Sequence, residues 1–252
     1  MYDVIKKIIL VTAVWALLSA AAQAQEKEEK KEKAYSSSTS FSLLMTSGNT
    51  QDLTLGFETE QNLNFDKNKV QFKGSVIYSE SEGTKDSELY YSHLQYKRSF
   101  SPKAYFLGHA GIERNVLSGY NYRFALNLGG GYTWWKSEKS EFSSEATLGW
   151  SRENNIQPPP LKDISLSFAS VVASSKLKIS LSSTSEFNIQ EILFLNLDDT
   201  DDYRISSVAS LAVSISSNLA LKISYQLKYN HQPVPGFKST DHYVLSSLVL
   251  NL

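Results

Sequence analysis

The sequence of 252 residues contains no cysteine, so no disulfide can stabilise its fold. Positive charge is not in excess either, because 25 basic and 26 acidic residues give a formal net charge of −1. A protein that binds phosphate backbones usually carries a basic stripe. The charge balance therefore predicts no nucleic-acid partner.

Long apolar runs are missing beyond the first 24 residues. The longest uncharged window, Ile205 to Leu221, contains six serines, and its apolar residues alternate with polar ones. A membrane-spanning helix needs about 20 mostly apolar residues, so we expect none in the mature chain. If that chain crosses a membrane, a closed β-barrel is the remaining structure that satisfies its backbone hydrogen bonds.

The first 24 residues have the three parts of a secretory signal peptide. Two lysines at positions 6 and 7 precede an apolar run over residues 8–18, and Ala22-Gln23-Ala24 is a small-residue cleavage site. We therefore expect export and cleavage after Ala24. Residues 25–37 would follow as a charged periplasmic tether, since they include a solvated tract of four Glu and four Lys at positions 26–33.

A period-two pattern dominates the rest of the chain. From Tyr122 to Trp134, every even position is aromatic, Leu or Gly, and every odd position is Arg, Ala, Asn, Gly or Thr. Strands of soluble sheets are usually about 5–6 residues long, which is much shorter than this segment. A tilted strand that crosses a bilayer needs about 9–11 residues, with aromatic girdles at both ends of its apolar row. The segment is therefore typical of a transmembrane β-barrel.

Similar alternation recurs along the chain and predicts an all-β fold, a transmembrane antiparallel up-and-down β-barrel over residues 38–252. Short and long connections alternate, as periplasmic turns and outer loops do in bacterial barrels. Ser175-Lys176 is one expected turn, and Ile192 to Asp202 is one expected outer loop. The twelve expected strands cover residues 38–47, 51–65, 69–80, 86–99, 104–116, 121–134, 141–153, 163–174, 177–190, 203–216, 219–231 and 241–252.

Several short motifs, in a fixed order, resemble those of one family. They are Thr46-Ser47-Gly48-Asn49-Thr50, Ser118-Gly119-Tyr120-Asn121-Tyr122-Arg123, Gly129-Gly130-Gly131-Tyr132, Asp202-Tyr203-Arg204 and Lys238-Ser239-Thr240-Asp241. Together they resemble the YdiY-like salt-induced outer-membrane proteins, a family defined by a domain of unknown function. The resemblance implies a barrel in the cell outer membrane, of undefined activity and linked to salt stress. The chain departs from such barrels by ending in Leu252 rather than the phenylalanine that the barrel-assembly machinery reads.

No pattern typical of an enzyme is present. A lipolytic barrel needs a serine and a histidine on its lipid face, and the four histidines are His93, His109, His231 and His242. Serine is so abundant that its proximity to a histidine carries no information, and no Gly-x-Ser-x-Gly motif occurs. We interpret the histidines as rim or lumen residues and expect neither catalysis nor a cofactor.

Four carboxylates fall in one expected outer loop, at Asp198, Asp199, Asp201 and Asp202. Clustered carboxylates can bind Ca²⁺, but this run lacks the glycine and the distal glutamate of an EF-hand loop. Plain solvent exposure is the favoured interpretation, and a bridge through divalent ions to lipopolysaccharide is the alternative. Outer-membrane lipid, lipopolysaccharide and the barrel-assembly machinery are the expected partners.

The polar row that is expected to line the lumen carries both signs of charge. It contains Glu58, Glu60, Lys73, Arg114, Arg123, Glu145, Lys222 and Lys228. A selective constriction is usually lined by one sign, although twelve strands enclose more space than the eight that side chains alone can fill. Three functions stay open. We rank a structural or envelope-stress role, with the lumen closed by internal ion pairs, ahead of a porin-like diffusion channel for small solutes, and an outer-membrane lipid-modifying enzyme last.

Overall fold

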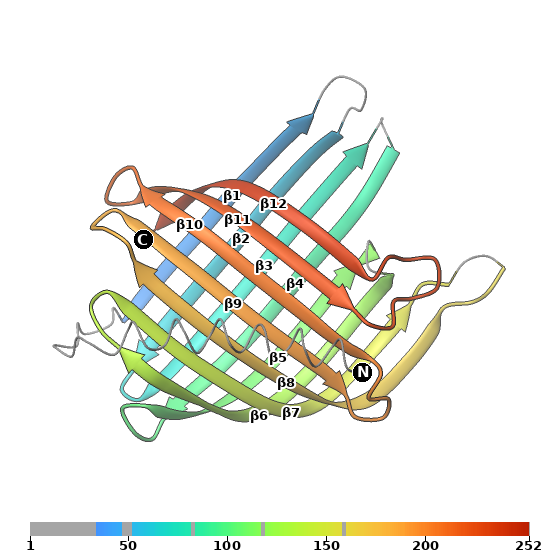
Figure 1. The fold of residues 1–252 in the computed structure, drawn as a ribbon, viewed down its shortest axis with the longest axis horizontal. Helices are drawn as coiled ribbons and strands as arrows, with labels where there is room; N and C mark the ends of the chain where they lie inside the picture. The colour runs from blue at the N-terminus through green and yellow to red at the C-terminus, as the bar shows by residue number, and fades with distance from the viewer. Residues whose placement is uncertain (1–33, 47–51, 82–83, 117–118, 158–159, 252) are drawn as a thin grey trace, which may run out of the picture.

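The computed structural model describes residues 34–46, 52–81, 84–116, 119–157 and 160–251. These segments form a closed barrel in which each strand pairs with its neighbours in sequence and the last strand pairs with the first (Figure 1). Within these segments, no helix is long and apolar enough to cross a membrane. The predicted signal peptide, residues 1–24, lies outside the described residues.

The predicted all-β, up-and-down barrel of twelve antiparallel strands is confirmed. Each strand is 12 to 17 residues long, well above the roughly 5–6 residues of soluble sheets. The strands are β1 (Tyr35–Thr46), β2 (Asp52–Phe65), β3 (Asn68–Ser81), β4 (Thr84–Ser99), β5 (Ala104–Asn115), β6 (Tyr120–Lys136), β7 (Ser140–Asn155), β8 (Ile164–Ser180), β9 (Ser185–Asn196), β10 (Tyr203–Ser214), β11 (Leu219–Asn230) and β12 (Thr240–Asn251).

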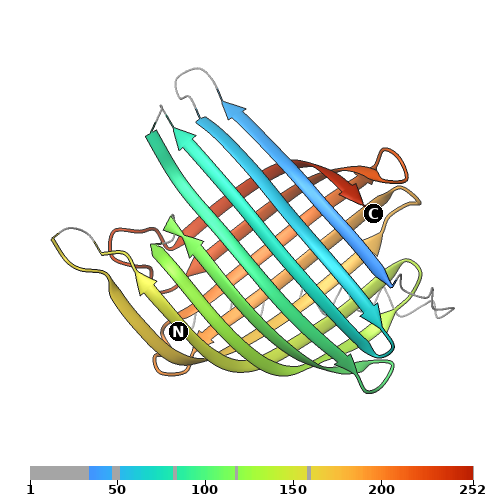
Figure 2. The ribbon, with the colours of Figure 1, turned by 180° about the vertical axis from the view of Figure 1, so that it is seen from behind.

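The wall of the barrel is continuous around the lumen. Figure 1 shows β9 to β12 in front, and Figure 2, from behind, shows β1 to β4 in front. β1 and β12 close the barrel by pairing at five residues each, from Ser38↔Asn251 to Ser42↔Ser247. Both chain ends of the barrel lie at the end that has the short turns. We call this the turn end and the opposite one the loop end.

Alternation along each strand separates the two faces of the wall. On β6, Leu126 and Leu128 point outward and are 47% and 63% exposed, whereas Asn127 between them is 5% exposed. Tyr132 and Trp134 continue the outward row toward the turn end, with ring centroids 5.0 Å apart. An apolar outer row that ends in aromatic residues is what a lipid-facing barrel surface requires.

The predicted turn at Ser175-Lys176 is wrong, because β8 continues to Ser180 and the turn occupies residues 181–184. Ser182 forms this turn, since its Oγ accepts the backbone N–H groups of Thr184 at 3.2 Å and Ser185 at 3.0 Å. Serine favours turns through such bonds. In this chain serine also fills the strands, so a pair of polar residues does not mark a turn.

The boundaries on either side shift accordingly. β9 spans Ser185–Asn196 rather than 177–190, and the outer loop predicted for residues 192–202 shrinks to residues 197–202. β1 begins at Tyr35, three residues before the predicted start at 38. The last residues assigned to the tether are therefore already hydrogen-bonded strand.

One outward position in the middle of a strand is charged. Glu191 lies on the face of β9 opposite Phe194, which packs against Arg204 inside the barrel. Its neighbours in register are Ser175 and Ser207, and Ser207 Oγ donates a hydrogen bond of 2.6 Å to its carboxylate. In β6 to β11, no other described outward residue is charged if it lies four or more residues from the end of its strand.

Candidate functional site: a charge network at the loop end

Six charged side chains from five strands and one loop meet inside the barrel near its loop end. We call them the loop-end network: Glu113, Arg123, Glu153, Asp202, Arg204 and Lys228. Three carboxylates face three cations, so the network is neutral overall. Alternation places each of these strand residues on the inward face, and the outward rows of the same strands are mainly apolar.

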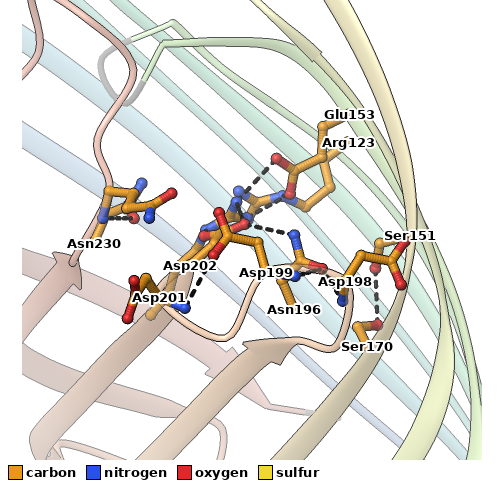
Figure 3. Close-up of polar contacts among 12 residues, drawn as sticks. Arg123, Ser151, Glu153, Ser170, Asn196, Asp198, Asp199, Asp201, Asp202 and Asn230 are labelled. Carbon is orange, nitrogen blue, oxygen red and sulfur yellow. Dashed lines mark hydrogen bonds and ion pairs between the residues drawn. The ribbon is translucent and has the colours of Figure 1, made fainter.

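Glu153 of β7 is the centre of this network and is 0% exposed. Its carboxylate accepts a hydrogen bond from Arg123 Nε at 2.6 Å. It accepts two more from Arg204, one from Nη1 and one from Nη2 at 3.0 Å. The carboxylate of Asp202 accepts hydrogen bonds from Arg204 Nε and Nη2, both at 3.0 Å. Figure 3 shows Arg123 and Glu153 of the barrel wall next to Asp202 of the loop formed by residues 197–202.

The network also connects opposite walls of the barrel. Lys228 Nζ of β11 lies 3.3 Å from Glu113 Oε1 of β5, although these strands are six positions apart in a ring of twelve. Arg123 Nη1 lies 3.6 Å from the same carboxylate. Side chains from facing strands can meet in this way only across the lumen.

Two aromatic rings pack against the guanidinium groups. The Tyr120 ring lies 4.1 Å from Arg123 Cζ and 5.3 Å from Arg204 Cζ, and the Phe194 ring lies 4.8 Å from Arg204 Cζ. Such cation–π contacts stabilise a desolvated guanidinium. The Tyr120 hydroxyl also accepts a hydrogen bond of 2.9 Å from Asn230 Nδ2 of β11, which is a second contact across the lumen.

The loop between β11 and β12, residues 231–239, reaches the opposite rim. Its Val234 is 5% exposed, and a Cβ on Gly119 would lie 2.8 Å from Val234 Cβ. Gly119 has a φ of +82°, a conformation that favours glycine. The loop therefore lies directly against Gly119, which immediately precedes β6, above the loop-end network.

Other predicted lumen residues form a second set of ion pairs closer to the turn end. Lys222 Nζ of β11 lies 3.3 Å from Glu58 of β2, and Lys73 Nζ lies 3.0 Å from Glu60. Lys97 of β4 lies 2.5 Å from Glu145 of β7, three strands away. The six charged residues proposed for the lumen, Glu58, Lys73, Arg123, Glu145, Lys222 and Lys228, each contact an opposite charge.

Arg114 lies apart from these residues. It follows the inward-facing Glu113 and so lies on the opposite, outward face of β5, where its Nη1 donates to the backbone oxygen of Asn121 at 3.2 Å. The structure thus does not bring Arg114 into the lumen row. A register shift between Glu113 and Asn115 marks the irregular end of this strand, and period-two counting is least informative there.

The four aspartates of the 197–202 loop do not act as one group. Asp202 is buried and paired with Arg204, whereas Asp198, Asp199 and Asp201 are exposed. Asn196 Oδ1 accepts the backbone N–H groups of Asp198 and Asp199, at 2.9 and 3.3 Å (Figure 3). In the described part of the chain, no group of three or more His, Cys, Asp or Glu side chains has metal-binding geometry.

The histidines near the rim contact tyrosines. Tyr225 Oη lies 2.8 Å from His242 Nδ1, and Tyr229 Oη lies 3.0 Å from His231 Nδ1. His231 also stacks on Tyr203, with ring centroids 4.6 Å apart. These pairs resemble an interfacial aromatic girdle and contain no activated serine.

The period-two reading missed three members of the loop-end network: Glu113, Glu153 and Arg204. All three are inward positions close to a strand end. The signal that could have found Glu113 and Glu153 is their opposite sign to Arg123 and Lys228, and for Arg204 it is its opposite sign to Asp202, because buried charges need partners. Which partners meet depends on contacts across the lumen, which alternation along a single strand cannot reveal.

The chain is similar to one protein family and to several solved structures. A family profile described as "Protein of unknown function, DUF481" matches residues 39–251. The translocator domain of the autotransporter NalP from Neisseria meningitidis is similar with a TM-score of 0.51 and 10% identity, over 97% of this chain and 96% of that one. The KdgM porin in complex with disordered oligogalacturonate has a TM-score of 0.43 and 8% identity, over 85% and 96%. A search of curated proteins found no match.

Proposed function

The chain belongs to the DUF481 family of proteins of unknown function, and we propose that it is an outer-membrane barrel whose lumen is closed at rest by the loop-end network. On this proposal the barrel has a structural role in the cell envelope, including under salt stress, and is not an enzyme. Export through a signal peptide cleaved after Ala24, insertion by the barrel-assembly machinery and contact with lipopolysaccharide belong to the same proposal.

The observation that carries the proposal is the contact between Lys228 and Glu113 from opposite walls. An ion that enters from the loop end meets this pair, the Arg123–Glu153–Arg204 cluster and the Tyr120 ring in one layer. The layer is neutral, so it offers no net field to attract one sign of ion. The adjoining pairs of Glu153, whose side chain is 0% exposed, resist opening, since separating them leaves charges without partners.

A diffusion channel for small solutes is the second candidate. The ion pairs nearer the turn end are partly hydrated, with the Glu58 side chain 46% exposed and that of Lys73 30% exposed. Twelve strands leave more internal space than side chains alone fill. A channel of this kind requires the loop-end network to open.

Liposome swelling separates the two functions. Liposomes that contain the wild type should swell in a small sugar no faster than empty liposomes. Glu113→Gln with Lys228→Met removes the contact across the lumen and should increase the swelling rate several-fold. The matched control is Glu186→Gln with Lys178→Met, which removes a pair between adjacent strands with 36% and 47% exposure.

The control variant should behave as the wild type. Swelling by the wild type at the rate of an open porin would reject the closed barrel and support the channel. A network variant that folds, as judged by its heat-modifiable migration, and stays impermeable would show that the Lys228–Glu113 contact does not close the lumen.

A further inference from the structure

Two histidines meet inside the barrel below the loop-end network. His93 comes from β4 and His109 from β5, and His109 Nε2 lies 3.3 Å from His93 Nδ1. Gly111 is the register partner of His93 and leaves room for the rings, because a Cβ there would lie 3.1 Å from His109 Cε1 and 3.3 Å from His93 Cδ2. Neither imidazole belongs to the loop-end network.

We infer that His93 Nδ1 and His109 Nε2 are two ligands of a site for a divalent d-block ion, with Cu²⁺, Zn²⁺ and Ni²⁺ as the chemical class. Imidazole nitrogen binds such ions at about 2.0–2.1 Å. Two bonds of that length to nitrogens 3.3 Å apart enclose an angle of about 104–111° at the ion. This is close to the tetrahedral value that Zn²⁺ favours, and a small approach of the two nitrogens gives the tetragonal geometry of Cu²⁺ and Ni²⁺.

The orientation of the rings agrees with this. Their centroids are 5.0 Å apart and their planes are inclined by 74°. A contact with both ring axes along the N···N line would place the centroids farther apart. The axes of His93 and His109 are therefore bent away from that line, as they must be for two lone pairs to converge on a shared ion.

Asn127 supplies a group that can fix the tautomer of His109. It is 5% exposed, its side-chain amide lies 3.3 Å from His109 Nδ1, and its Oδ1 is buried without a hydrogen-bond partner among the described residues. Rotation of the amide by half a turn places Oδ1 against Nδ1–H. His109 then presents the bare Nε2 to the ion, and a ligating histidine usually donates its other N–H in this way.

The charged side chains near the two histidines are engaged in ion pairs. Lys73 contacts Glu60, Lys228 contacts Glu113, and Glu145 contacts Lys97. Among the described residues, no group of three or more His, Cys, Asp or Glu side chains could hold a metal ion. Water therefore completes the coordination of an ion bound by the two histidines. The ion should exchange readily, and Cu²⁺ should bind most tightly of the three.

Titration of the refolded mature chain with CuSO₄ in detergent tests the inference. We expect saturable binding and an electron paramagnetic resonance spectrum with the superhyperfine pattern of two imidazole nitrogens. His109→Ala and His93→Ala should each lower the affinity at least tenfold and remove this pattern. Asn127→Leu should lower the affinity about 10–100-fold, as loss of an outer-shell partner does, and keep both nitrogens.

His231→Ala and His242→Ala, at the rim, are matched controls and should bind Cu²⁺ as the wild type does. The N-terminal amine is present in every variant, so differences among them report the histidines. His109→Gln provides a shape-conserving second variant if His109→Ala does not fold. Equal affinity and an equal spectrum for the wild type and a folded His93 or His109 variant would overturn the site, as would a wild type that binds no Cu²⁺.

Discussion

Replacing Glu153 by Gln should strongly destabilise the barrel. Glu153 is fully buried and accepts three N–H contacts from two guanidinium groups. Gln has nearly the same shape but no charge, and its NH₂ would face one of the arginines. The change therefore removes the one carboxylate that contacts both Arg123 and Arg204.

The magnitude follows from burial. Breaking a buried ion pair by removal of one partner costs about 3–5 kcal/mol. Arg123 keeps a contact of 3.6 Å with Glu113, and Arg204 keeps Asp202, so we expect a value near the lower end, about 3 kcal/mol. An exposed pair is worth about 0–1 kcal/mol. Glu141, 3.6 Å from Lys136 with both side chains about 40% exposed, provides that comparison.

Reversible urea unfolding in liposomes measures the difference, with the fluorescence of Trp134, Trp135 and Trp150 as the probe. Glu153→Gln should lower the free energy of unfolding by about 3 kcal/mol, and Glu141→Gln by less than about 1 kcal/mol. Equal losses for the two variants would refute the reasoning, because Glu153 would then contribute no more than a surface charge.

Three further predictions concern the wall of the barrel. Glu191→Leu replaces an outward carboxylate in mid-strand and should raise the free energy of unfolding by about 1 kcal/mol; a loss would show that its hydrogen bond with Ser207 outweighs the cost of its charge. Gly129→Ala should cost about 1–3 kcal/mol, since its Cβ would lie 2.1 Å from the backbone oxygen of Ala146. Gly130→Ala is its control, with ordinary contact at 3.4 Å, and equal losses in thermal melts would contradict the packing. Leu126→Arg should cost about 2–4 kcal/mol in lipid, and an unchanged urea midpoint would reject its outward placement.

The architecture could be read from the sequence because alternation is a local property. Each strand presents an apolar row on its outward face. For that reason the outward Leu126 and Leu128 flank the inward Asn127. Connections were less readable. Serines at positions 175 and 182 look alike in sequence, but only Ser182 caps a turn with its hydroxyl.

The site could be read only in part for a different reason. Arg123 and Lys228 are visible as charges in an inward row, but their shared partner Glu113 lies on a third strand. Such a meeting depends on the diameter of the barrel and on the stagger of its strands. No pattern within one strand encodes either quantity, so the pairing of Lys228 with Glu113 needed the closed structure.

The conductance of the wild-type barrel in a planar lipid bilayer tests the central claim most directly. At an ionic strength of about 0.15 M, where the Debye length is about 8 Å, the buried pairs of the loop-end network are little screened. Inserted wild-type protein should give a silent bilayer, and Glu113→Gln with Lys228→Met should give discrete opening steps. Stable, long-lived open steps from the wild type would contradict a lumen closed by its own ion pairs.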